Sequence, residues 1–462
     1  MSCQTNNLYN IVKEANVLKQ KHALQINDRV VSEIYHQAEA IARRVVCHRS
    51  KPGLDWDERL DNILTSRIWG FPSMLLLLGM VFWLTVAGAN YPSQLIAAVL
   101  FWGQDRLWDL LNWLQAPHWL ISFGVEGVYR CLAWVVSVML PPMAIFFPCF
   151  TLLEDLGYLP RVAFNLDRFF KSVGAHGKQA LTMSMGFGCN AAGVVACRII
   201  ESPRERLIAM LTNSFVPCNG RFPTLITLAG CLVFGFGSSL ATTAVVVGVV
   251  LFGIAVTLGV SWLLSHTLLK GVPSSFALEL PPYRKPQIGK VILRSVFDRT
   301  LFVLGRAVCV AAPAGAVIWL LANIRVGGIS LLARGADLLN PLAQPMGLDG
   351  FILMAFILGL PANEIVLPIL MMGYLAAGSL TELNSLQDLH HLLVVQHGWT
   401  WLTAVCVMLF SLLHYPCGTT LWTIWREAGS IKWALLAAAI PLAVACTVCF
   451  LTAQGARILG LV

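Results

Sequence analysis

The chain has 462 residues, of which 57% are hydrophobic and only 12% are charged. Soluble domains contain about 25% charged residues, so this composition excludes an ordinary soluble enzyme and predicts an integral membrane protein with several spans. The net charge of +8 is moderate, and Lys and Arg gather in loops, as expected of cytoplasmic loops. We therefore expect contact with a lipid bilayer and no nucleic-acid partner.

The thirteen cysteines stand mostly alone in apolar runs, and only Cys446 and Cys449 have a CxxC spacing. This pattern argues against a disulfide framework and predicts reduced thiols. The first 65 or so residues are polar, and the first apolar stretch is long enough to span a bilayer. A secretory signal peptide is therefore not expected.

Residues 1–66 are expected to form a cytoplasmic N-terminal segment. From Asp28 to Cys47, apolar residues recur at helical spacing, which predicts an amphipathic helix that packs on the membrane domain or on a partner. The arginines that follow place this end in the cytoplasm. A first span is predicted at Trp69–Ala89, and the Trp-rich remainder of residues 67–135 is expected to lie at the outer interface.

An unusual break interrupts the apolar run Gln179–Ile200. Its centre reads G-F-G-C-N, from Gly186 to Asn190, and a long hydrophobic helix has no local reason to carry these residues. In a bilayer, irregular backbone survives only where protein covers it or where it lines a polar path. Discontinuous helices of this kind mark substrate sites in transporters, so the run predicts a permease for a metal ion or small solute.

The second half of the chain repeats this plan. Residues 136–269 hold the first break and a later one at Pro217-Cys218-Asn219, followed by a span. After a basic cytoplasmic loop at 270–299, residues 300–462 hold a break at Leu360–Glu364, another at Pro416-Cys417, and a last span.

The positions of the basic segments constrain the number of membrane crossings. The N-terminus and loop 270–299 are both basic, so at least one apolar run should not cross the bilayer. The economical solution is that the G-F-G-C-N and L-P-A-N-E segments are re-entrant, with loop 375–397, which lacks Lys and Arg, outside. The expected fold is therefore all-α: a polytopic membrane protein with two repeats that contain broken or re-entrant helices, in inverted orientation.

Three cysteines and one carboxylate are the leading candidates for metal ligands. Cys189, Cys218 and Cys417 each stand beside a helix break, and thiolates favour late first-row metals. A membrane cysteine is more often a small hydrophobe, but three at three breaks favour ligands. Glu364 is a carboxylate within an apolar run, where such a group is costly and usually functional; it can alternatively balance a buried cation or cap the break.

Amide side chains accompany the same breaks. Asn190, Asn219 and Asn363 can supply oxygen ligands or satisfy the broken backbone. Arg221 lies close to a break and is a candidate counter-ion for Glu364 or a gate element.

Two acidic residues, Glu154 and Asp155, end the second predicted span, Leu132–Leu153. They are candidates for a cytoplasmic exit vestibule that attracts cations, although pairing with Arg161 and Arg168 explains them equally well.

Nucleotide-binding and hydrolase motifs are absent from the sequence. It contains no G-x-x-x-x-G-K-[ST], H-E-x-x-H or G-x-S-x-G, and the segment Gly174–Gln179 only partly matches a phosphate loop. The chain is therefore expected to be a transporter that binds no nucleotide and no cofactor, rather than an enzyme.

The order of the motifs resembles one known family. Over about residues 28–455 the chain is similar to the membrane domain of FeoB ferrous-iron transporters, through L-L-E-D-L-G-Y (152–158), R-x-A-F-x-x-D-R (161–168), G-F-G-C-N, N-S-F-V-P-C-N-G-R-F-P (213–223), L-P-A-N-E-I-V (360–366), Y-P-C (415–417) and R-E (426–427).

This resemblance implies two "gate" repeats at about 140–232 and 305–425, and Fe²⁺ as the transported substrate. It also implies that Cys189, Cys218 and Cys417, with Glu364 beside them, pass the ion. The chain departs from the family in lacking an N-terminal G-protein domain, since residues 1–27 are too short for one. Two explanations fit this departure: a split system with a separate FeoB-type GTPase, which the retained linker helix favours, or a relative that has lost nucleotide control. The resemblance also implies a small SH3-like accessory protein. A homo-oligomer and a prokaryotic inner-membrane location with a cytoplasmic N-terminus are further expectations.

Three alternatives stay open. The substrate can be another divalent metal, such as Mn²⁺, Zn²⁺ or Co²⁺. It can also be a nucleoside-like solute, although few aromatic and hydroxyl groups are seen beside the breaks. The third alternative is a membrane scaffold or metal-sensing subunit that transports nothing.

Overall fold

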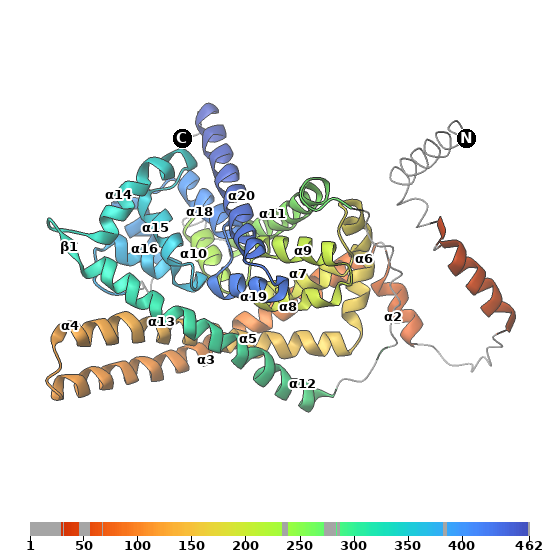
Figure 1. Ribbon diagram of the computed structural model, residues 1–462, viewed down its shortest axis with the longest axis horizontal. Coiled ribbons are helices and arrows are strands. Elements are labelled where there is room, and N and C mark those ends of the chain that lie inside the picture. The colour runs from red at the N-terminus through yellow and green to blue at the C-terminus, as the bar shows by residue number, and fades with distance from the viewer. Residues whose placement is uncertain are drawn as a thin grey trace, which may run out of the picture.

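The structure is a computed structural model of the chain, and it describes residues 29–30, 32–45, 56–66, 68–232, 239–271, 283, 287–381 and 386–460. Within these ranges nearly all secondary structure is helical (Figure 1). The strands found there are β1 (Arg325–Val326) and β2 (Ile329–Ser330), which pair antiparallel. The expected all-α fold is confirmed.

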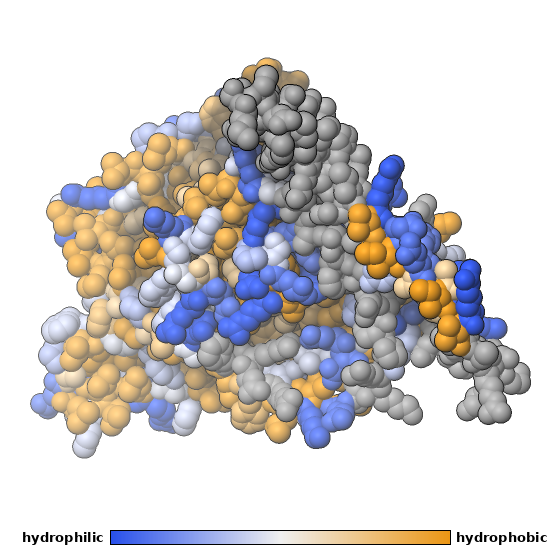
Figure 2. All heavy atoms as spheres, turned by 45° about the vertical axis from the view of Figure 1, so that its right-hand side comes forward, coloured by the Kyte–Doolittle hydropathy of each residue, from blue (hydrophilic) through white to orange (hydrophobic). Residues whose placement is uncertain are grey.

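Six helices in the described part are long and apolar enough to cross a bilayer: Gly70–Trp113, His118–Asp155, Thr242–His266, Val303–Asn323, Trp401–Ala428 and Ile431–Ile458. Apolar side chains also cover much of the visible outer surface of the helical body in Figure 2, where a soluble protein would place polar ones. The chain is therefore a multi-pass membrane protein.

The first two spans form a long hairpin, which the sequence did not predict. Helix α3 (Gly70–Trp113) does not end near Ala89 but runs on through Pro92 and the Trp-rich region expected at the interface. It packs along the return arm, which consists of α4 (His118–Ile121), the π-helical turn η1 (Ser122–Tyr129) and α5 (Arg130–Asp155) (Figure 1). A single proline removes one hydrogen bond, and packing against α5 holds the helix through it.

The N-terminal helices lie at one side of this body. Residues 32–45 are helical, as predicted, but every described side chain of this segment is exposed, so it does not pack on the membrane domain. Helix α2 (Trp56–Leu64), by contrast, contacts the first repeat.

The first repeat continues from α5 through a series of short helices. They are α6 (Tyr158–Ser172), α7 (Gln179–Gly188), α8 (Asn190–Ala196), η2 (Cys197–Ile199), α9 (Pro203–Thr212), η3 (Asn213–Phe215) and α10 (Phe222–Leu232), and α11 (Ser239–His266) follows as a smooth span.

The second repeat also places a helix break before a later Pro-Cys break, but it contains more elements. It comprises α12 (Ile288–Arg294), η4 (Ser295–Leu301), α13 (Phe302–Asn323), α14 (Leu331–Ala343), η5 (Gln344–Met346), α15 (Gly350–Leu358), η6 (Asn363–Ile365), α16 (Val366–Tyr374), α17 (Leu386–His390), η7 (His391–Gln396), α18 (Trp401–Leu413), α19 (Gly418–Ala428) and α20 (Ile431–Ile458). Helix α14 contains Asn340-Pro341. With η5 it bends by 108° into α15, the geometry of a broken span or of a re-entrant loop.

The two repeats interlock rather than stand apart. Helix α5 packs on α13, α8 packs on α19, and α10 packs on α18. The broken helices of one repeat are therefore in contact with the later, Pro-Cys-containing run of the other.

Candidate functional site

The first break is built around one extended residue. Cys189 separates α7 from α8 with φ −155° and ψ 124°, and the side chain of Asn213 fills the notch beside it. A Cβ on Gly186 would lie 2.7 Å from Asn213 Oδ1, and one on Gly193 would lie 2.6 Å from Asn213 Nδ2. These two glycines thus make room for Asn213, whose Nδ2 donates to the carbonyl of Asn190 at 3.1 Å.

The second break has the same backbone conformation. Ala362, between α15 and η6, has φ −152° and ψ 123°. Aligning G-L-P-A-N with G-F-G-C-N therefore makes Ala362 the counterpart of Cys189 and Asn363 the counterpart of Asn190. The second break thus has an alanine where the first has a cysteine, whereas the asparagine occurs in both breaks.

Each Pro-Cys segment docks on the break within its own repeat. The backbone N–H of Asn219, after Cys218, donates to Gly188 O at 3.4 Å. The N–H of Gly418, after Cys417, donates to Leu360 O at 2.7 Å. Carbonyls freed at the end of α7 and after α15 are satisfied in this way.

The two repeats meet through these segments. Asn363 Nδ2 donates to Cys218 Sγ at 3.9 Å, and a Cβ on Gly220 would lie only 2.2 Å from Glu364 Oε1. The carboxylate of the second repeat thus rests on the backbone of the first.

The three candidate thiols lie in the same region. Those of Cys189, Cys218 and Cys417 lie within electrostatic range of one another, and the Glu364 carboxylate lies within this range of the last two. The structure therefore brings these four predicted residues together.

The group is not a closed metal cage. Among the described residues, no three His, Cys, Asp or Glu side chains are close enough to one another to hold an ion. No ion pair joins Glu364 to a cation in that part of the chain either. In this geometry the thiols and the carboxylate would bind an ion only together with backbone carbonyls, side-chain amides and water. Such mixed, open coordination is typical of a transport path.

Unsatisfied polar atoms concentrate around the breaks. Buried polar groups are normally hydrogen-bonded, and leaving one unpaired costs about 1–3 kcal/mol. Several here have no hydrogen-bond partner within the described part of the chain: both side-chain polar atoms of Asn190, Oδ1 of Asn213 and Asn363, Oγ of Ser214, and Nε2 of His414. Such a concentration favours a place occupied by water or by an ion.

Arg221 does not act as the counter-ion of Glu364, one of its two expected roles. Its side chain is 1% exposed and donates to four carbonyls, those of Ser214 (2.7 Å), Leu412 (2.6 Å), His414 (2.9 Å) and Tyr415 (3.0 Å). Three of these acceptors lie at the end of α18. The guanidinium thus clamps the first repeat to the break of the second.

Glu154 and Asp155 lie apart from this site. Both are exposed at the end of α5, eight residues beyond Phe146, whose ring packs on Gly188. Eight helical residues span about 12 Å. Their expected partner Arg161 binds Asp61 instead, at 3.0 Å, so pairing with Arg161 is wrong.

Sequence reasoning passed over Asn213 and Ser214 as site residues and left Asn363 out of the first choice of ligands. All three are buried beside the breaks. The match of G-L-P-A-N to G-F-G-C-N was the available signal for Asn363. Nothing local distinguishes Asn213, because its role depends on glycines some 20 to 30 residues earlier.

The fold and the site define a class: a multi-pass membrane protein with two similar repeats whose helices break opposite each other, the architecture of secondary transporters. Comparison with known proteins agrees. The Gate family model, described as "Nucleoside recognition", matches residues 136–232 and 304–431. A second model, "Ferrous iron transport protein B C terminus", matches residues 246–299.

Curated relatives cover nearly the whole chain. The Fe(2+) transporter FeoB of Staphylococcus aureus (strain COL) is 30% identical over 427 residues, 91% of this chain and 62% of the relative. That of Methanocaldococcus jannaschii is 28% identical over 88% of this chain and 60% of the relative. A Porphyromonas gingivalis protein named as a fusion of Fe(2+) transport protein A with FeoB is 28% identical over 85% and 51%. No solved structure matches the chain.

The chain is thus similar to FeoB proteins over about nine-tenths of its length. It spans about three-fifths of the length of the curated relatives that it matches.

Proposed function

We propose that the chain carries Fe²⁺ across the prokaryotic cytoplasmic membrane. The observation that supports this most directly is the contact between the repeats, where Cys218 meets Asn363 and Glu364 rests on Gly220. An ion at this contact touches both repeats at once, so a small movement of one repeat against the other changes its coordination. Relatives named Fe(2+) transporters support the choice of substrate.

The proposed ligands suit a borderline-soft divalent ion. Thiols of Cys189, Cys218 and Cys417 favour late first-row metals, while the Glu364 carboxylate and the amides of Asn190 and Asn219 supply oxygen. Unpartnered amide atoms at the breaks replace part of the hydration shell. Because no three acidic, thiol or imidazole groups converge in the described part, binding is weak enough for release.

The depth of the site follows from helix lengths. Helix α7 has ten residues and α15 has nine, about 15 and 14 Å, half of a 30 Å hydrocarbon core. Their breaks therefore lie near the middle of the bilayer, with the repeats inverted. We place the N-terminus and the basic loop 270–299 in the cytoplasm, where Glu154 and Asp155 attract the leaving ion.

Nucleotide control is proposed to come from a separate FeoB-type GTPase, with a small SH3-like accessory protein and a homo-oligomer as further elements of the system. The relative that fuses Fe(2+) transport protein A to FeoB supports an accessory partner.

A nucleoside-like substrate is the second candidate, because the Gate model carries the description "Nucleoside recognition". Aromatic residues are more numerous at the breaks than the sequence suggested. However, Phe356 and Phe410 have ring centroids 4.8 Å apart, and Phe356 and His414 have theirs 4.9 Å apart. Packed on one another, they offer little free surface to a base.

The test is uptake of radiolabelled Fe²⁺, kept reduced, into proteoliposomes that contain this chain alone. We expect Cys218→Ser and Glu364→Gln each to lower the initial rate by about tenfold or more, as loss of metal-site groups does. Cys446→Ser, in the last span, is the matched control and should keep the wild-type rate. Uptake of a labelled nucleoside without uptake of Fe²⁺, or transport of neither by inserted protein, would overturn the proposal.

A further inference from the structure

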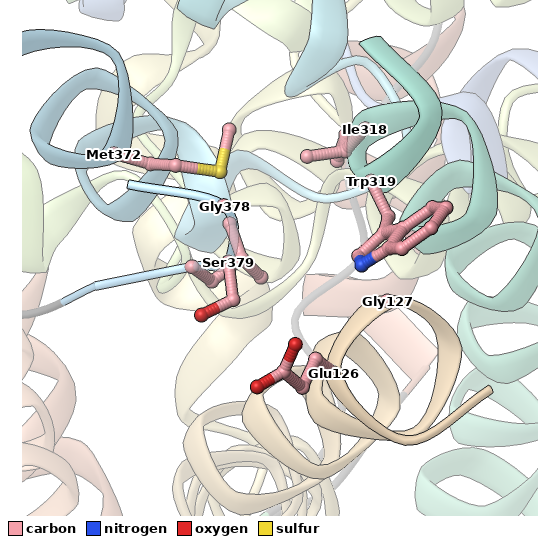
Figure 3. Close-up of a pocket in the computed structure, with 9 residues that line it drawn as sticks. Glu126, Gly127, Ile318, Trp319, Met372, Gly378 and Ser379 are labelled. Atoms are coloured by element: carbon pink, nitrogen blue, oxygen red, sulfur yellow. The ribbon is translucent and has the colours of Figure 1, made fainter. Parts of the chain in front are cut away.

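A small pocket lies between η1, α13 and the segment that follows α16. Its lining includes Glu126 and Gly127 of η1, Trp319 of α13, Met372 of α16, and Ser379. Its empty volume is about 190 Å³, which includes space open to the outside. In Figure 3 the Glu126 carboxylate lies below the Ser379 hydroxyl, the Met372 sulfur lies above both beside Gly378, and the Trp319 indole lies to their right.

The pocket arises from close helix packing beside an irregular turn. A Cβ on Gly127 would lie 2.8 Å from Trp319 Cβ, and one on Gly315 would lie 2.6 Å from Cys131 Cβ. Glycines on both elements thus bring the backbones together. The π-helical turn η1 interrupts the regular α spacing here, and such turns are frequent at functional sites.

The Glu126 carboxylate in this pocket accepts a hydrogen bond but forms no ion pair within the described part of the chain. Glu126 Oε2 accepts a hydrogen bond from Ser122 Oγ at 2.5 Å, and that hydroxyl accepts one from Trp319 Nε1 at 3.1 Å. No cation forms an ion pair with Glu126 in the described part of the chain. In the described part of the chain no hydrogen bond reaches its second oxygen, Oε1, which can therefore bind another ligand.

The pocket lies along the elements that lead to the breaks. Met372 follows Glu364 by eight residues, about 12 Å of helix. On α13, Trp319 follows Val310 by nine residues, about 14 Å, and the Val310 side chain faces Gly418 beside Cys417. Ser379 belongs to the loop 375–397 that lacks Lys and Arg. The pocket is therefore at the opposite end of these helices from the proposed cytoplasmic exit.

We propose that this pocket is an outer loading site for a divalent cation. The ligands are the Glu126 carboxylate, the Ser379 hydroxyl and the Met372 thioether, with water completing the shell. This inference rests on the proposed function, because it makes the pocket the first binding site on the same ion-transport path. The oxygen ligands hold any divalent ion, and the thioether favours the softer late first-row metals.

A positively charged side chain, that of Arg130, lies beside the proposed site. Arg130 Nη1 donates to Ser379 Oγ at 3.4 Å, a long contact, and the buried Nε of Arg130 has no hydrogen-bond partner among the residues that the structure describes. Its positive charge opposes the incoming ion, so loading requires the guanidinium to release Ser379. Arg130 is a positioning residue that sets how tightly the ion is held, and its removal should strengthen binding.

The test measures Mn²⁺ bound to the purified full chain in nanodiscs by electron paramagnetic resonance. We expect Glu126→Gln to remove one bound ion or weaken its affinity by about tenfold or more, and Arg130→Gln to tighten it. Asp109→Asn, an exposed carboxylate on α3, is the matched control and should change nothing. Met372→Leu should leave Mn²⁺ binding intact but reduce the preference for Co²⁺ over Mn²⁺.

A second readout uses Trp319, whose fluorescence a bound paramagnetic ion quenches. Wild-type minus Trp319→Phe spectra should show Co²⁺ quenching that Glu126→Gln abolishes. Unchanged Mn²⁺ stoichiometry and affinity in Glu126→Gln, or quenching that persists in it, would refute the site. Binding at the pocket is measured without transport, so its loss is distinguishable from failure of the uptake test. Cys218→Ser should block uptake and leave this binding intact.

Discussion

Gly220 and Glu364 touch across the boundary between the repeats, with no room for a side chain between them: an added Cβ would lie 2.2 Å from the carboxylate oxygen. Either the carboxylate or the backbone must move if residue 220 gains a methyl group. The backbone position of Gly220 in the first repeat thus determines where the Glu364 carboxylate of the second repeat can lie.

Gly220→Ala should therefore impair Fe²⁺ uptake by displacing Glu364. We expect a rate close to that of Glu364→Gln, measured in the same proteoliposomes. Gly248→Ala is the control, because a Cβ at Gly248 in α11 meets nothing within 4 Å. Wild-type uptake in Gly220→Ala would show that the position of the carboxylate is unimportant.

Arg221→Lys should destabilise the protein. Lysine cannot reproduce the fork that donates to carbonyls from both repeats, and unpaired buried acceptors cost about 1–3 kcal/mol each. The expected result is a fall in the thermal unfolding temperature in detergent. Arg168→Lys, at an exposed position on α6, should leave that temperature unchanged.

The ion pair between Arg161 and Asp61 makes stability depend on pH. Burial opposes ionisation of Asp61, but hydrogen bonds from Arg161 and Tyr283 outweigh it and hold the pKa of this carboxyl below its ordinary value. Because the folded pKa is the lower one, the pair contributes fully above the unfolded pKa of about 4. The contribution disappears as pH falls through the folded pKa.

Thermal unfolding between pH 7 and pH 3 measures this effect. We expect Asp61→Asn to lose roughly 2 kcal/mol at pH 7, a discounted value because the Asp61 side chain is 31% exposed. Wild type and variant should converge at the acid end. A constant difference over the whole range would contradict the linkage.

Arg198 and Glu427 join the ends of α8 and α19, with Nε–Oε2 and Nη2–Oε1 distances of 2.7 and 2.6 Å. Arg198 is 66% exposed, so we expect a stability effect below about 1 kcal/mol. The same pair connects the helices that begin at Cys189 and Cys417, and we expect charge reversal in Arg198→Glu to change the uptake rate. Restoration in the double variant Arg198→Glu/Glu427→Arg would assign that change to the pair; no restoration would exclude it.

Local patterns predicted the breaks well, because Gly, Pro and polar residues in an apolar run are incompatible with a regular helix. Cys189, Cys218, Cys417 and Glu364 could be chosen for that reason alone, and the structure places them in one region. Their shared location depends on the second repeat packing on the first, which no local pattern specifies.

The errors have the same origin. The predicted first span ends at Ala89, but packing against α5 carries α3 on through Pro92. Arg161 looked like a partner for its neighbours in sequence, whereas its partner, Asp61, is 100 residues away. In both cases a contact with a distant segment outweighed the nearby sequence.

The length of α3 has a consequence for how this protein meets its surroundings. Its 44 residues extend about 66 Å, and even at a tilt of 40° they rise about 50 Å, some 20 Å more than the hydrocarbon core. The exposed charges of Asp105, Arg106 and Asp109 lie in its last third, which marks that end as the part in water. That end is therefore accessible to partners that do not enter the bilayer.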